Sequence, residues 1–327
     1  MSPARPIRLL HLYADLLNLY GENGNMRVLA QALAKAGATV EIAYSSLAEQ
    51  PDFASCDLAY IGCGTEQKQL QALDHLKAFR GELASYLKAG GLLLTTGNAG
   101  DLFGSRIITE DASAVPALDL FSYQSRRLAE REVGEVLFTY GGGAGGSDGD
   151  GSDGAGGSDG AGSYGDSSYG SCGYLVGFQN RGSRIECLRC ERGQVTPLFN
   201  VIKGYPTVYV DGADAEPLTK PPMEPSTTAD EKPTEGLQIR GFFTSSVLGL
   251  LTRNPRLVAW LAEYLFQRHA ESFIDPSFAS EAPLSQSVRL DWPPPNLTTS
   301  SDQRFDLTLD VVALEAFIRH HHGILLS

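Results

Sequence analysis

Three turns in this chain carry residue types that could do chemistry, and each follows a short apolar stretch. They are Asp15, the run Gly62-Cys63-Gly64, and residues 97–101. Ligand sites of open α/β sheets lie outside the carboxyl ends of the strands, so we expect these turns to share one site. Cys63 is the one cysteine in them. We interpret it as a small buried residue that fills its loop rather than as a nucleophile, since no histidine lies near it in sequence.

Two other groups of residues have the composition of metal ligands. The run Cys187-Leu188-Arg189-Cys190 has the spacing of half a zinc site, but the second pair is missing, and an incidental strand or hairpin pair is the better interpretation. His320, His321 and His322 are interpreted as a solvated chain end. We therefore predict no metal and no other cofactor.

The elements that must position these turns alternate between strand and helix. Apolar or β-branched stretches predict strands at residues 7–13, 39–43, 57–61 and 92–96. Helical spacing of apolar residues predicts helices at residues 26–35 and 66–88. This alternation predicts a parallel, doubly wound sheet with flanking helices, an α/β fold of the flavodoxin-like kind. Further strands are predicted at residues 132–139, 174–178 and 241–246, followed by a helix at residues 255–268.

Two inserts interrupt the predicted domain, which spans residues 1–270. Residues 141–172 are almost wholly Gly, Ser, Asp and Ala, and such a segment cannot bury enough apolar surface to offset its ordering entropy. We predict that it is disordered. Residues 213–234 are rich in Pro, Glu and Thr and are predicted to form a loop. Residues 271–327 are predicted to be a linker and a tail, with a terminal helix at residues 307–318.

Composition narrows the class of protein. The formal net charge is −13, and no run of lysines and arginines offers a surface for phosphates, so we expect no nucleic-acid partner. No apolar run approaches the ~20 residues of a spanning helix, so we expect no insertion into a membrane. Five cysteines without framework spacing suit a reducing compartment, and we expect a cytoplasmic protein.

The sequence resembles the GatD proteins, which are class I glutamine amidotransferase subunits of lipid II isoglutaminyl synthase, related to cobyric acid synthase amidotransferase domains. The most specific match is the run LLNLYGENGN at residues 16–25. Weaker matches follow in the same order as in the family: residues 61–64, 101–104, 176–180, 203–205, 211–212, 235–236, 253–255 and 260–261. The resemblance covers about residues 7–268.

The resemblance implies a cysteine nucleophile on a tight strand-to-helix turn, activated by a histidine, with a glycine-rich loop to bind the oxyanion. The place of the nucleophile falls on Gly97, and the place of the histidine falls near Ser245. No histidine occurs in residues 241–251, and no cysteine between residues 64 and 171. Both reactive side chains are therefore missing. Gly62 and Gly64 match the oxyanion loop. Arg131 matches an arginine that the family uses to bind glutamine, and a surface arginine at a strand end is an equally good interpretation of it.

Three hypotheses follow. The first is a GatD-like subunit that pairs with a MurT-like Mur ligase in amidating the D-glutamate of peptidoglycan, with glutamine as the family's ammonia source and with degenerate glutaminase chemistry in this chain. The second is a non-catalytic pseudo-amidotransferase that acts as a scaffold or regulator of such a partner. The third is a module that binds glutamine or another small molecule in the former substrate pocket. Because the nucleophile and the histidine are missing, the sequence leaves open whether the chain is itself an enzyme.

Overall fold

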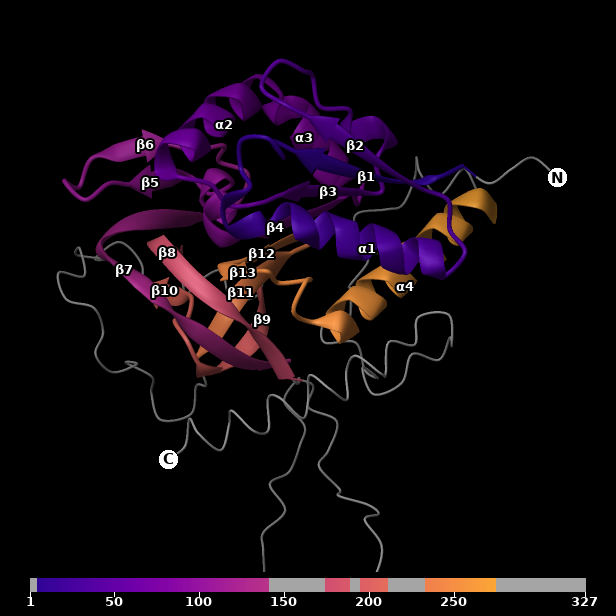
Figure 1. Cartoon of the computed structure of the whole chain (residues 1–327). Helices are drawn as coiled ribbons and strands as arrows, with labels where there is room; N and C mark the ends of the chain where they lie inside the picture. Colours follow the sequence, from indigo (N-terminus) through magenta and orange to yellow (C-terminus); the bar gives the residue numbers. More distant parts are fainter. Residues whose placement is uncertain (1–4, 141–173, 189–194, 211–232, 275–327) are drawn as a thin grey trace, which may run out of the picture.

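The protein is seen here in a computed structural model, which describes residues 5–140, 174–188, 195–210 and 233–274 (Figure 1). Both predicted inserts lie outside these ranges, apart from the last two residues of the second. The predicted terminal helix at residues 307–318 and His320, His321 and His322 also lie outside the described residues, as does Cys190.

A mixed sheet organises the chain. Its main path has the order β10-β8-β7-β9-β11-β12-β4-β3-β1-β2. Five adjacent strands run parallel: β1 (Ile7–Leu12), β2 (Val40–Ser45), β3 (Leu58–Ile61), β4 (Leu92–Thr96) and β12 (Phe242–Ser245). Their order, β2-β1-β3-β4-β12, is the 2-1-3-4-5 order of flavodoxin-like sheets. The predicted fold class is confirmed for this half.

The other half of the sheet is mostly antiparallel and was only partly predicted. Long strands β7 (Tyr123–Tyr140) and β8 (Tyr174–Leu188) pair with each other, and β7 also pairs with β9 (Thr196–Lys203). Strand β11 (Thr234–Ile239) joins β9 to β12. The shorter strands are β5 (Arg106–Ile108), β6 (Ala114–Pro116), β10 (Val208–Val210) and β13 (Val247–Leu248).

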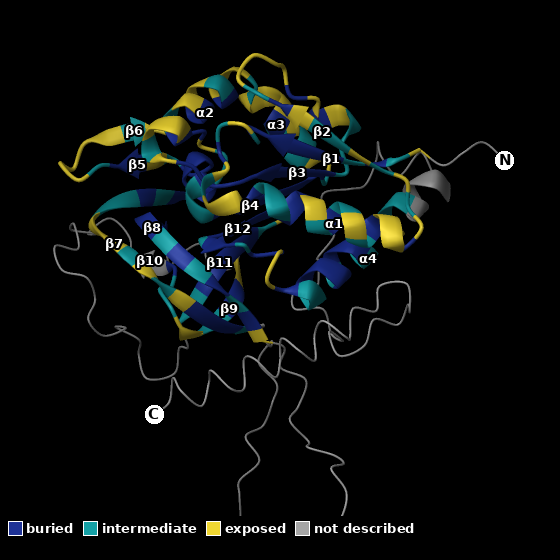
Figure 2. Ribbon diagram, viewed as in Figure 1, coloured by how far each residue is buried: buried dark blue, intermediate teal, exposed yellow. Residues whose placement is uncertain are grey.

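Helices cover both faces of the parallel strands. Helices α1 (Asn23–Lys35) and α4 (Pro255–Ile274) lie side by side on one face, and α2 (Glu66–Ala78) and α3 (Arg80–Lys88) lie on the other (Figure 1). Successive residues of a strand point to opposite faces of the sheet. In β1, Leu9 packs on the side of α1 and α4, and Leu10 packs on the side of α2 and α3. Figure 2 shows these strands buried between helices whose outer faces are exposed.

Two predicted helices differ in extent from the observed ones. The single helix expected at residues 66–88 is broken at Phe79, whose φ of −110° and ψ of 17° leave the helical region. The last helix continues to Ile274, past the predicted end at residue 268 and into the segment predicted to be a linker. The predicted end came from the apolar residues at positions 257–265, whereas the helix also contains Phe273 and Ile274.

The run at residues 16–25 that carries the most specific match contains two buried polar residues, Glu22 and Asn25. Glu22 is 1% exposed, and its carboxylate accepts hydrogen bonds from Thr96 Oγ1, from Tyr60 Oη at 3.1 Å and from the Gly249 N–H at 2.8 Å. Asn25 accepts from the Leu251 N–H at 2.9 Å. This run thereby ties the loop before α4 to the ends of β3 and β4, which is a structural reason for its composition.

Candidate functional site

Gly97 occupies the turn after β4, at the position that the resemblance assigns to the nucleophile. Gly97 has a φ of +62°, in the left-handed region that favours glycine. It begins a short 3₁₀ helix, η3 (Gly97–Leu102), rather than the α-helix that we expected behind the turn. Six residues of 3₁₀ helix supply little of the axial dipole that would favour a thiolate.

Cys63 fills the space into which a side chain at position 97 would project. A Cβ atom built on Gly97 would lie 2.2 Å from Cys63 Cβ, 3.1 Å from Cys63 Sγ and 3.1 Å from Leu248 Cδ2. Such distances are far below van der Waals contact, so these two loops fit together only with glycine at position 97. The turn is therefore closed to a nucleophile in this conformation.

The Cys63 thiol is not activated. It is 4% exposed, and burial, with a smaller contribution from the Glu22 carboxylate, raises its pKa to about 12. Among the residues that the structure describes, no histidine is hydrogen-bonded to it; the thiol lies 3.9 Å from the Leu19 carbonyl oxygen and is also within reach of the Asn98 backbone. A neutral buried thiol is a poor nucleophile. These observations agree with the interpretation of Cys63 as a loop-filling residue.

Ser245, which the resemblance places near the position of the histidine, lines the same cavity as Gly97. Strand β12 runs parallel to β4, with Ser245 in register with Thr96, so Ser245 and Gly97 meet at the carboxyl edge of the sheet. Ser245 Oγ donates to Glu235 Oε2 at 2.9 Å and accepts from the Val247 N–H at 3.2 Å. The Ser245 hydroxyl thus donates its proton to the Glu235 carboxylate, and this hydrogen bond links β12 to β11.

Gly62 and Gly64 allow the loop before α2 to pack closely. A Cβ on Gly62 would lie 2.8 Å from the Leu17 carbonyl oxygen, and one on Gly64 would lie 2.4 Å from Leu17 Cδ2. The Gly64 N–H donates to Asn98 Oδ1 at 3.2 Å, while Asn98 Nδ2 donates to the Gly64 carbonyl oxygen at 2.9 Å. The Gly64 amide that the resemblance places in the oxyanion loop thus has a partner inside the protein.

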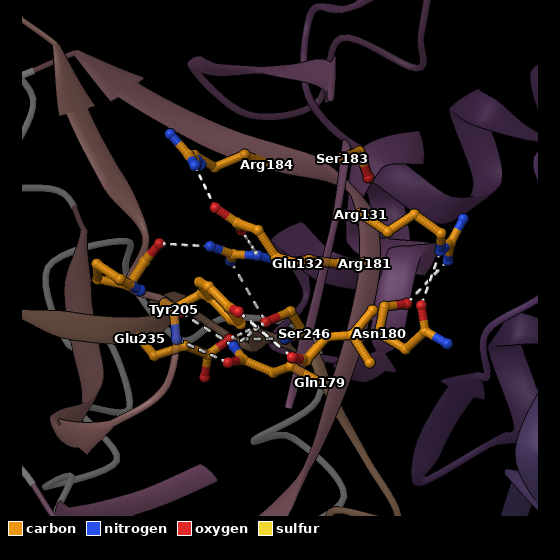
Figure 3. A network of polar contacts seen from close by, with 12 residues as sticks. Arg131, Glu132, Gln179, Asn180, Arg181, Ser183, Arg184, Tyr205, Glu235 and Ser246 are labelled. Atoms are coloured by element: carbon orange, nitrogen blue, oxygen red, sulfur yellow. Dashed lines mark hydrogen bonds and ion pairs between the residues drawn. The ribbon is translucent and has the colours of Figure 1, made fainter. Parts of the chain in front are cut away.

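Arg131 lies on the rim of the site rather than inside it. Its side chain is 45% exposed and forms an ion pair with Glu66, Nη1 to Oε1 at 2.9 Å. Arg131 Nε donates to Asn180 Oδ1 at 2.7 Å, and its Nη2 donates to the Asn180 carbonyl oxygen at 2.9 Å (Figure 3). These contacts use three of the five guanidinium N–H groups, which leaves one on Nη1 and one on Nη2 for a carboxylate ligand.

A small polar cavity lies beside Gly97 and Ser245. Its lining includes three charged residues, Asp101 from η3, Arg181 from β8 and Glu235 from β11. It also includes the hydroxyl-bearing residues Ser183, Thr244 and Ser246. Asp101, Arg181 and Glu235 are 3%, 4% and 1% exposed. The cavity has room for about one or two water molecules. An amino acid would need a wider opening.

The charges around the cavity compensate one another. Arg181 Nε donates to Glu132 Oε2 at 2.5 Å, and its Nη2 donates to the Pro206 carbonyl oxygen at 2.9 Å (Figure 3). Glu235 accepts from the Ser246 N–H at 2.7 Å and from Ser246 Oγ at 2.8 Å. Burial nevertheless raises the pKa of Glu235, because these donors only partly replace water. The network joins β7, β8, β11 and β12.

Sequence reasoning missed the buried charges of this network. Asp101 was noticed only as the end of the turn at residues 97–101 and in a weak family match, Glu235 only in such a match, and Arg181 was not singled out. A buried ion pair leaves no periodic signal beyond a charged residue at an inward-facing position of a strand. Only the register of Glu132 with Arg181 across β7 and β8 makes the pair visible.

Comparisons with known proteins agree with the resemblance seen in the sequence. The chain is 27% identical over 131 residues to the GatD subunit of the glutamine-hydrolysing lipid II isoglutaminyl synthase of Streptococcus pneumoniae, covering 40% of this chain and 50% of that protein. It is 25% identical over 131 residues to the same subunit of Staphylococcus aureus, covering 40% and 54%. The chain resembles GatD. It spans about half the length of these curated relatives.

Structural comparison finds glutamine amidotransferases. One neighbour is a glutamine amidotransferase from Thermotoga maritima, with a TM-score of 0.39, 12% identity and coverage of 84% of this chain and 89% of that one. Another is the glutaminase domain of CTPS from Trypanosoma brucei with bound acivicin, with a TM-score of 0.36, 9% identity and coverage of 81% and 94%. No family model matches the chain.

Two further expectations concern metals and membranes. Within the ranges that the structure describes, no group of three or more His, Cys, Asp or Glu side chains could hold a metal ion. Within the same ranges, no helix is long and apolar enough to cross a membrane.

Proposed function

We propose that this chain is a GatD-like subunit of a lipid II isoglutaminyl synthase type of complex, and that it does not hydrolyse glutamine through a cysteine and a histidine. Its partner would be a MurT-like Mur ligase in the cytoplasm, which would hold the ATP and peptidoglycan sites. The similarity to GatD supports the assignment to such a complex. The site beside β4 supports the loss of the hydrolytic step.

One observation carries this proposal: Cys63 lies where the side chain of residue 97 would be. A glycine that merely replaced a nucleophile would leave an empty space, whereas here the neighbouring loop has closed onto the turn. In enzymes with a nucleophile, a base and an orienting group, removal of the nucleophile costs about six orders of magnitude in rate. The partner ligase would then take free ammonia as its nitrogen source.

The test uses the full chain co-purified with the Mur-ligase-like protein encoded in the same genome. Amidation of a lipid II substrate is measured with ATP and either glutamine or ammonium chloride as the nitrogen donor. We expect product with ammonium and none with glutamine, and no glutamate released from glutamine. Glutamine-dependent amidation at a rate comparable to the ammonium-dependent one would refute the loss of hydrolysis.

The alternative of a non-catalytic scaffold or regulator makes a different prediction in the same assay. The ligase alone would then amidate with ammonium, and addition of this chain would change only its stability or its rate. If the ligase neither binds this chain nor responds to it, the assignment to such a complex is wrong.

A third function, binding of glutamine at the rim, is favoured by Arg131 and Glu66. Their side chains offer a cation and an anion about 2.9 Å apart and about half exposed, which suits the carboxylate and ammonium groups of an amino acid. Calorimetry with glutamine on the chain and on Arg131→Ala tests it. Heat of binding that Arg131→Ala abolishes would support this module, and absence of binding to the unmodified chain would exclude it.

A further inference from the structure

The segment at residues 18–21 crosses from the Cys63 loop to strand β8. At one end, the Leu19 N–H donates to the Cys63 carbonyl oxygen at 2.9 Å. At the other, Tyr20 Oη accepts from Asn180 Nδ2 at 2.6 Å. Adjacent residues of one short segment thus hold the two sides of the site together.

Tyr20 adopts a conformation that tyrosine rarely adopts. Its φ of 63° lies in the left-handed region, where the Cβ atom of an L residue crowds the backbone, and its side chain is 56% exposed. Exposure means that burial of the ring does not compensate for this strain. Asn180 Nδ2 donates a hydrogen bond to the Tyr20 hydroxyl, while the neighbouring Leu19 is held by the Cys63 carbonyl oxygen. Backbone strain of this kind clusters at segments that switch between conformations.

The far end of this contact is itself anchored. Asn180 receives hydrogen bonds from Arg131 at its side-chain and main-chain oxygen atoms, and Arg131 is paired with Glu66 at the start of α2. The row Tyr20–Asn180–Arg131–Glu66 therefore closes a ring of contacts from the Leu19 segment through β8 and β7 to α2. Glu66 lies three residues after Cys63, so the ring encloses the Cys63 loop.

We propose that Tyr20 is a latch: its contact with Asn180 keeps the Leu19 segment over Cys63, and its release opens the approach to the turn at Gly97. The closed state accounts for the 4% exposure of Cys63, whose thiol lies beside the Leu19 carbonyl oxygen. Opening would move the segment from the left-handed conformation at Tyr20 to a relaxed one, so relief of strain offsets part of the lost hydrogen bond. This inference is independent of the partner and the reaction proposed above.

The test follows alkylation of Cys63 by N-ethylmaleimide in the full chain, with the modified peptides resolved by mass spectrometry. Tyr20→Phe keeps the ring and removes the hydroxyl, and Asn180→Ala removes the donor. A single exposed hydrogen bond shifts an open–closed equilibrium by about two- to tenfold, and we expect Cys63 to react faster by that factor in each variant. Tyr44→Phe is the matched control, because Tyr44 is 58% exposed and lies on β2.

Cys56 serves as an internal reference for general loosening, since it is part-buried near α3 and away from the latch. The proposal holds if Cys63 accelerates in Tyr20→Phe and in Asn180→Ala while Cys56 keeps its rate and Tyr44→Phe changes neither. Unchanged reactivity of Cys63 in both latch variants overturns it. Equal acceleration of Cys56 and Cys63 also overturns it, because that result reports loss of global stability.

Discussion

The fit between Gly97 and Cys63 predicts a specific pattern of coupled stabilities. Gly97→Ala would place a Cβ atom 2.2 Å from Cys63 Cβ, and overpacking of this kind costs about 1–3 kcal/mol. The left-handed φ of +62° costs a non-glycine residue a further ~1–2 kcal/mol. We therefore expect Gly97→Ala to lower the free energy of unfolding by about 2–5 kcal/mol.

The double variant Gly97→Ala with Cys63→Gly removes the steric part and leaves the backbone strain. In a double-mutant cycle, this predicts a favourable coupling of about 1–3 kcal/mol between the two positions. Cys63→Ala is the matched control, because it removes the sulfur but keeps the Cβ atom with which the new methyl group collides. The same cycle with Cys63→Ala should show little coupling.

The measurement is urea unfolding of the four proteins in each cycle, with the slope against denaturant checked for constancy. A Gly97→Ala variant within about 0.5 kcal/mol of the unmodified chain would refute the reasoning, since additive sites agree within that margin. Equal rescue by Cys63→Ala and Cys63→Gly would locate the conflict at the sulfur rather than at the two Cβ atoms.

Two further predictions concern the buried charges. Burial raises the pKa of Glu235 above its ordinary value of 4.5, so the folded state binds more protons than the unfolded chain, and stability should fall as pH rises from about 4.5 through the raised pKa. Glu235→Gln should flatten that dependence in unfolding measured across pH; an unaltered slope would contradict it. Arg181→Ala removes one of the two arginines that pair with the Glu132 carboxylate, since Arg184 also pairs with it, and should cost about 1–3 kcal/mol, whereas Arg5→Ala, where the arginine side chain is 46% exposed, should cost under about 1 kcal/mol. If the two variants lose similar amounts of unfolding free energy, burial does not strengthen the Arg181–Glu132 pair.

Glycine and strand patterns were sufficient to predict the parallel half of the fold. The strand at Leu92–Thr96 was predicted with its observed bounds, because a fully buried parallel strand has an uninterrupted apolar or β-branched run followed by glycine. The antiparallel half was harder to predict from the sequence. Strand β7 is 18 residues long and carries several arginines and glutamates, so only its last apolar part was predicted.

The candidate site shows the same division. The positions of Gly97 and Ser245 were found by counting from motifs, and strand register then placed them together. The role of Cys63 could not be found that way, because its contact with Gly97 joins residues 34 positions apart across two parallel strands. Arg131 was found by spacing, but its pairing with Glu66 and Asn180 depends on how β7 and β8 lie against α2.

The sequence by itself determined the order of strands and helices and the absence of a cysteine and a histidine at the expected positions, because periodicity and residue identity are local properties. Tertiary structure decided that the vacated turn is filled by Cys63, that the glycine amide at residue 64 is already bonded, and that Glu235 and Arg181 are buried beside it. These are contacts between distant segments, and their energies depend on distances of a few tenths of an ångström, which no local pattern encodes.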